Sequence, residues 1–192
     1  CYCYLSKMGY SNSGNDIKTV SADYVLNILQ NSNLKITSST LITLGCFSEC
    51  WDENNKPETI KLIKHFLQKG NQIQLSTKRK ISLNELTDII PLIKYYGQLV
   101  VFVSCATISK QSYIESNTTE IEGRFKTFKE LQDHIPTVLY IKPVLKNITI
   151  KDVELFKSYI ELYNIKDVVV GSIFTNESSL ETVHFSNKEN LF

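Results

Sequence analysis

The side chains best suited to chemistry in this sequence come directly after short apolar segments. They include a thiol, hydroxyls, carboxylates and amines, which could bind or position a small polar ligand. These side chains are Cys46, Ser48, Glu49, Ser76, Lys78, Ser104, Cys105, Lys142 and Ser172. If the apolar segments are parallel strands, their carboxyl ends lie on one side of the sheet. This is where α/β proteins place their catalytic and binding residues. The sequence therefore predicts one polar site built from several strand ends.

The cysteines indicate thiols or metal ligands rather than disulfides. There are five of them, Cys1, Cys3, Cys46, Cys50 and Cys105, and no secretory signal is visible. Cys46 and Cys50 are four residues apart, so on a helix they could share a face and bind a metal. Gly45 and Trp51 favour a loop there instead, and we expect ordinary buried thiols. Cys105 follows a core strand and is expected either to pack or to form part of a substrate-pocket wall.

Apolar strand patterns alternate with capped helix patterns along the whole chain. We expect strands over residues 1–5, 40–44, 72–77, 99–103, 137–141 and 167–170. Ser21 and Pro57 are predicted to begin helices. A capping box at Ser82–Glu85 predicts a helix that continues through Ile93, and Thr149 is predicted to cap the last helix.

Strict alternation of strand and helix predicts an α/β fold with a parallel sheet and right-handed crossovers. A complete eightfold barrel takes about 250 residues, more than the 192 present. We therefore expect a partial parallel (βα)6 barrel similar to a TIM barrel, with an open doubly wound sheet as the alternative. Residues 1–175 would form this core, and residues 176–192 an extension or a truncated continuation.

The charge balance, the apolar segments and the missing motifs argue against several classes of function. Lys and Arg number 21 and Asp and Glu number 20, so the net charge is +1 and gives no electrostatic argument for nucleic acid or a membrane surface. No apolar run approaches the roughly 20 residues of a membrane-spanning helix, and we expect a cytoplasmic protein. The sequence holds no glycine-rich phosphate loop, no zinc-protease HExxH and no nucleophile elbow.

The first residues carry a family resemblance. Tyr2-Cys3-Tyr4-Leu5 resembles the end of the radical SAM cluster motif, C-x3-C-x2-C, in its form C-x-Y-C-Y-L. On that alignment Cys3 is the third cluster ligand, and the chain opens inside the motif. Cys1 is an alternative second ligand, although its spacing to Cys3 is one residue short.

Later segments resemble the spore photoproduct lyase-like, or DNA-repair photolyase-like, branch of this family. They are residues 44–51, residues 75–78, the pair Ile114-Glu115 and the pair Gly123-Arg124. Two departures affect the cofactor contacts. Gly45-Cys46 with Ser48 and Glu49 stands where the family has Gly-Gly-Glu, and no Gly-x-Ile-x-Gly follows the fifth predicted strand.

The resemblance implies a [4Fe-4S] cluster with one open iron that binds S-adenosylmethionine. In this family, reductive cleavage gives a 5′-deoxyadenosyl radical that abstracts hydrogen from a substrate, here unknown, with an electron donor such as flavodoxin or ferredoxin. It implies Cys3 and Cys1 as metal ligands. It implies cofactor contacts from Ser48, Glu49, Ser76, Lys78, Ser104 and Arg124. DNA repair is not carried over, because the charge shows no basic stripe.

Two other functions stay open. One is a degenerate, non-catalytic barrel that serves as a binding module. The other is a barrel lyase that forms a Schiff base through Lys78 or Lys142, a chemistry that needs a lysine with a lowered pKa in a dry pocket. Lys78 could also belong to a solvated basic turn.

Overall fold

The computed structural model describes residues 19–46 and 48–174. The predicted first strand at residues 1–5, the proposed ligands Cys1 and Cys3, and the extension at residues 176–192 lie outside the described residues.

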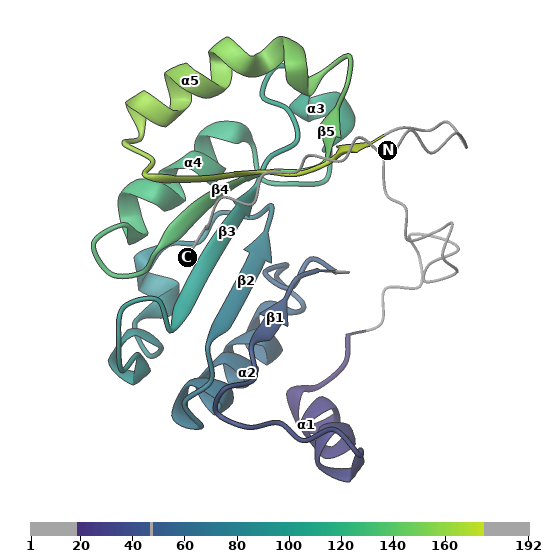
Figure 1. The fold of residues 1–192 in the computed structure, drawn as a ribbon, viewed down its shortest axis with the longest axis vertical. Coiled ribbons are helices and arrows are strands. Elements are labelled where there is room, and N and C mark those ends of the chain that lie inside the picture. Colours follow the sequence, from purple (N-terminus) through teal and green to yellow (C-terminus); the bar gives the residue numbers. More distant parts are fainter. Residues whose placement is uncertain (1–18, 47, 175–192) are drawn as a thin grey trace.

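The centre of the fold is a parallel sheet of five strands (Figure 1). The strands are β1 (Ile42–Leu44), β2 (Ile73–Thr77), β3 (Leu99–Ser104), β4 (Thr137–Ile141) and β6 (Asp167–Val170). They pair in the order β1-β2-β3-β4-β6, and every pairing is parallel. The predicted α/β class and parallel sheet are therefore confirmed. Closure into a barrel is not shown, and the partial barrel stays a prediction.

The strand order bears on the doubly wound alternative. A doubly wound sheet reverses its strand order at a switch point, whereas the five strands of this sheet follow one another in chain order. Right-handed crossovers between such neighbours place the connecting helices on one face. In Figure 1, α2 (Lys56–Gln68) passes behind β1 and β2. A second sheet pairs β5 (Val144–Leu145) with β7 (Ile173–Phe174), also in parallel.

Four further α-helices are present, and α1, like α2, begins where the sequence predicts. They are α1 (Ala22–Asn31), α3 (Gln111–Ile114), α4 (Ile121–Leu131) and α5 (Val153–Leu162). The Ser21 hydroxyl caps α1 by accepting a hydrogen bond from the Tyr24 amide. Pro57 lies in the first turn of α2, where its missing amide hydrogen costs nothing.

The helix predicted from Ser82 to Ile93 is wrong in type. The Ser82–Glu85 capping box is present, but it begins a 3-10 helix at Leu83–Leu86, and a second 3-10 helix follows at Ile90–Leu92. Pro91 lies in the second one. A proline has no amide hydrogen to donate and its ring collides with the preceding turn, so a continuous α-helix is excluded there.

Thr149 does not cap the last α-helix. It begins a 3-10 helix, Thr149–Asp152, and α5 follows at Val153. Its hydroxyl donates to the carbonyl of Ala106 at 2.6 Å and accepts from the Leu145 amide at 2.8 Å. The bond to Ala106, 43 residues away in the chain, fixes this segment to the end of β3, whereas the bond from Leu145 is local.

The two faces of the sheet differ in burial. Along β2, Ile73 and Leu75 are fully buried, while Gln74 and Ser76 between them are half-buried. Along β3, Leu99, Val101 and Val103 are fully buried. Side chains alternate between faces along a strand, so one face is packed and the other is less covered.

A helix that could cross a bilayer is not found among residues 19–46 and 48–174, because no helix there is both long and apolar enough.

Candidate functional site

A cavity of about 1070 Å³ lies on the less covered face of the sheet and extends to the carboxyl ends of the strands. Its floor is formed by alternate strand residues: Thr43, Gln74, Ser76, Phe102, Ser104, Tyr140 and Val169. The pairing register explains this set, because Ser76 lies opposite Phe102 and Ser104 lies opposite Tyr140 in neighbouring strands. The loops that follow the strands form its rim.

Five of the six residues predicted to contact the cofactor line this cavity. They are Ser48, Glu49, Ser76, Lys78 and Ser104. Cys46 and Lys142, which also follow strands, line it as well. The carboxyl ends of parallel strands meet at one edge of the sheet, and this arrangement brings these seven residues together. Their role in binding stays a prediction.

Glu49 joins the first two strand ends. One of its carboxylate oxygens accepts hydrogen bonds from the Thr77 hydroxyl and the Trp51 amide. The other accepts from the Lys78 amide at 2.8 Å. The carboxylate therefore holds the loop after β1 against the end of β2 while it lines the cavity.

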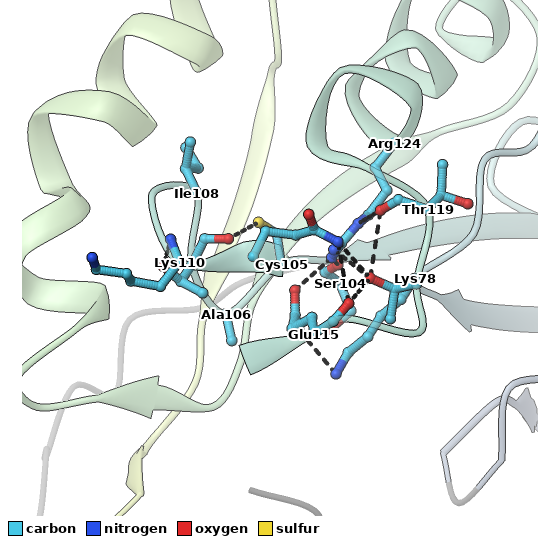
Figure 2. Close-up of polar contacts among 12 residues, drawn as sticks. Lys78, Ser104, Cys105, Ala106, Ile108, Lys110, Glu115, Thr119 and Arg124 are labelled. Carbon is cyan, nitrogen blue, oxygen red and sulfur yellow. Dashed lines mark hydrogen bonds and ion pairs between the residues drawn. The ribbon is translucent and has the colours of Figure 1, made fainter. Parts of the chain in front are cut away.

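Lys78 and Arg124 both contact Glu115 (Figure 2). Lys78 Nζ lies 3.0 Å from Glu115 Oε1, and Arg124 Nη1 lies 2.6 Å from Glu115 Oε2. The side chains of Glu115 and Arg124 are fully buried, whereas that of Lys78 is 25% exposed. Charge-assisted hydrogen bonds of this kind are roughly twice as strong as neutral ones. We name Lys78, Glu115 and Arg124 the cavity triad.

Arg124 does not line the cavity, contrary to the expectation that it contacts a cofactor there. It lies in the first turn of α4 and is 0% exposed. Besides Glu115, its guanidinium donates to the carbonyls of Thr119 and Ser104 and to the Thr118 hydroxyl. A guanidinium donates from a planar fork, and these partners hold it beneath the cavity wall.

Two aromatic floor residues were not singled out by the sequence. Phe102 and Tyr140 meet edge to face, with ring centroids 5.8 Å apart, and Lys142 Nζ lies 5.5 Å from the Tyr140 centroid. The edge-to-face pair is a favourable arrangement of two rings, and an ammonium near a ring face is attracted to it electrostatically. Phe102 belongs to a strand that is apolar on both faces, so no sequence pattern assigns it to the cavity.

The described cysteines do not form a metal site. Burial raises the pKa of Cys50 to about 12, helped by the nearby Glu49 carboxylate. Burial also raises the pKa of Cys105 to about 12. Cys46 is exposed, so the expectation that it is a buried thiol is wrong, whereas Cys50 is buried as expected. The described residues contain no group of three or more His, Cys, Asp or Glu side chains placed to hold a metal.

Comparison with known proteins gave no match: no family model, no curated protein and no solved structure is significantly similar to this chain.

Proposed function

We propose that this protein is a radical SAM enzyme that acts on a substrate not yet known. The observation that carries the proposal is the cavity at the carboxyl ends of the chain-ordered parallel strands. Ser48, Glu49, Ser76, Lys78 and Ser104 all line this cavity. The resemblance at residues 1–5 and its continuation through the strand ends support the same family.

The donor set of the cavity suits S-adenosylmethionine. Small-molecule cavities usually measure about 300–1000 Å³, so about 1070 Å³ leaves room for a cofactor and part of a substrate. The Lys78 ammonium suits a carboxylate, the Glu49 carboxylate suits an amino group, and the Ser76 and Ser104 hydroxyls can donate or accept. Phe102 and Tyr140 offer apolar surface to a ring.

The described thiols do not supply cluster ligands, so Cys3, with Cys1 as the alternative, stays the proposed metal ligand of this chain. When bound, the cluster and S-adenosylmethionine supply a carbon radical that abstracts hydrogen, using an electron from a donor such as flavodoxin or ferredoxin. The chain's own contribution is to bind, orient and shield the reacting groups. A reducing compartment such as the cytoplasm suits the free thiols of Cys46, Cys50 and Cys105.

Anaerobic reconstitution of the full-length protein tests the proposal. We expect iron and sulfide to bind in a ratio of one cluster per chain, and 5′-deoxyadenosine to form from S-adenosylmethionine under reduction. Cys3→Ala should abolish both, because it leaves the cluster under-ligated. Cys105→Ala is the matched control and should keep both, since Cys105 is buried away from the cavity.

Other outcomes decide against the proposal. S-adenosylmethionine binding without a cluster or turnover would favour the binding module. Borohydride trapping of a carbonyl substrate on Lys142 would favour the Schiff-base lyase. Full cluster content and activity in Cys3→Ala would show that the alignment at residues 1–5 is wrong.

A further inference from the structure

The cavity triad contains one carboxylate between two cations. Glu115 is 4% exposed and Arg124 is 0% exposed, and of the three only Lys78 and Glu115 line the cavity. The three formal charges sum to +1. Arg124 is fully buried, so the Lys78 ammonium is the cation of the triad that reaches the cavity.

Arg124 is held at several points. Its Nε donates to the Thr119 carbonyl at 2.7 Å, Nη1 to the Ser104 carbonyl at 2.9 Å, and Nη2 to the Thr118 hydroxyl at 2.7 Å. These contacts tie the last residue of β3 to the segment just before α4. The Arg124 guanidinium is planar and its three nitrogens are all hydrogen-bonded, so it holds the Glu115 carboxylate that it also contacts in a fixed position.

Thr119, in the segment before α4, also hydrogen-bonds to the main chain just after β2. The Thr119 amide donates to the Lys78 carbonyl at 3.2 Å, and the Thr119 hydroxyl accepts from the Lys80 amide at 3.1 Å. Lys78 is therefore fixed at its backbone by Thr119 and at its ammonium by Glu115. Figure 2 shows Lys78, Glu115, Thr119 and Arg124 gathered beside Ser104.

We infer that Glu115 and Arg124 are positioning residues that set where the Lys78 ammonium lies in the cavity wall, and so control the binding of an anionic group through Lys78. The anionic group is the carboxylate of S-adenosylmethionine; that part of the inference rests on the proposed function. Arg124 acts on the ligand only through Glu115 and Lys78.

A double-mutant cycle on the full-length protein tests the coupling. S-adenosylmethionine affinity is measured by calorimetry for Lys78→Ala, Glu115→Gln and the double variant. Each single variant should bind about tenfold more weakly or worse, the size expected for losing a charged hydrogen bond. The double variant should bind no more weakly than Lys78→Ala, because Glu115 has no effect without the lysine. Lys80→Ala is the matched control and should bind normally, since its ammonium pairs with Glu130 outside the cavity.

A second measurement needs no ligand. Acylation by an amine-reactive ester is mapped on Lys78, with Lys80 in the same chain as the internal reference. The Lys78-to-Lys80 rate ratio should rise in Glu115→Gln, whereas general loosening would raise both rates together. Arg124→Lys keeps a cation opposite Glu115 and should give a smaller rise and a smaller loss of affinity. If Glu115→Gln does not fold by circular dichroism, Arg124→Lys takes its place in the cycle.

Two results would overturn the inference. One is an unchanged affinity and an unchanged acylation ratio in a folded variant of Glu115 or Arg124. The other is a double variant whose loss equals the product of the two single losses. If the unaltered protein does not bind S-adenosylmethionine, the proposed function fails, while the acylation ratio still decides the positioning role.

Discussion

Among single residues, those directly after a strand could be placed from sequence, and those on a helix could not. Ser76 lies at the carboxyl end of β2 and Lys78 follows the strand directly, and a parallel strand has only one carboxyl end. Arg124 lies in the first turn of α4, where spacing does not tell whether the guanidinium reaches a cavity or a neighbouring loop. Its partner Glu115 is nine residues earlier, a separation that no local pattern connects.

The three described thiols should differ sharply in reactivity. Cys46 is exposed, whereas burial raises the pKa of Cys50 and of Cys105 to about 12 each. The thiolate is the reacting form, so near neutral pH iodoacetamide should modify Cys46 in the folded protein and spare the other two. Peptide mapping by mass spectrometry, before and after denaturation, measures this. Rapid labelling of Cys50 or Cys105 in the folded chain would contradict their burial.

Asp152 is a buried structural carboxylate that the sequence did not reveal. One oxygen accepts from the Thr107 hydroxyl and from the amides of Ile108 and Ser109, which shapes the loop after β3. Asp152→Ala should lower the free energy of unfolding by roughly 1.5–3 kcal/mol, the value of hydrogen bonds to a charged group. Chemical denaturation measures the loss. The exposed Asp133→Ala is the control and should change stability by less than about 0.5 kcal/mol.

The pH dependence of this loss has a definite sign. Burial alone would raise the pKa of Asp152, but the hydrogen bonds from Ser109, Thr107 and Ile108 outweigh it and hold the pKa below its usual 3.8. The carboxylate therefore stabilises the fold fully above the unfolded-state pKa, and this stability is lost as pH falls through the lower folded-state pKa. The gap between the unaltered chain and Asp152→Ala should shrink in acid; a gap that widens below pH 4 would refute this account.

At the scale of elements, local signals predicted where helices begin better than which kind of helix forms. The Ser21 cap and the Ser82–Glu85 box are both present. The box nevertheless begins a 3-10 helix, because Pro91 limits the length of the segment, and a short segment gains little from α-helical hydrogen bonds. Thr149 shows the other limit, since its hydroxyl donates to the carbonyl of Ala106, a partner that only the tertiary fold brings to it.

The turn after β1 depends on a glycine for two separate reasons. Gly45 has φ +85°, and a Cβ there would lie 1.9 Å from the Ser76 carbonyl oxygen in the next strand. Gly45→Ala should therefore be destabilising by more than the ~1–2 kcal/mol of left-handed strain alone. Gly97→Ala is the matched control, because Gly97 has φ +88° with no atom within 4 Å of the added carbon. Thermal unfolding compares the two; equal losses would mean that the turn can move away from β2.

At the scale of the whole molecule, the alternation of elements predicted the parallel sheet, but not the face that carries the cavity. The β3 segment is apolar on both faces, so Val101 and Phe102 look equivalent in sequence. The chain order of the strands decides between them. It places the crossover helices on one face, which buries Val101, and leaves Phe102 in the cavity floor.

Neighbouring residues of β2 test this division of the molecule into two faces. Leu75 is fully buried, so Leu75→Ala should cost about 2–5 kcal/mol in the free energy of unfolding, from lost apolar contact and the void left behind. Ser76 is half-buried and lines the cavity. Ser76→Leu adds volume where there is space, so it should change stability by only about 0.5 kcal/mol while it reduces the affinity for S-adenosylmethionine. Denaturant unfolding and calorimetry on the same samples separate the two effects. A large loss of stability in Ser76→Leu would show that this face is packed in solution, and the site would then have to lie at the strand ends alone.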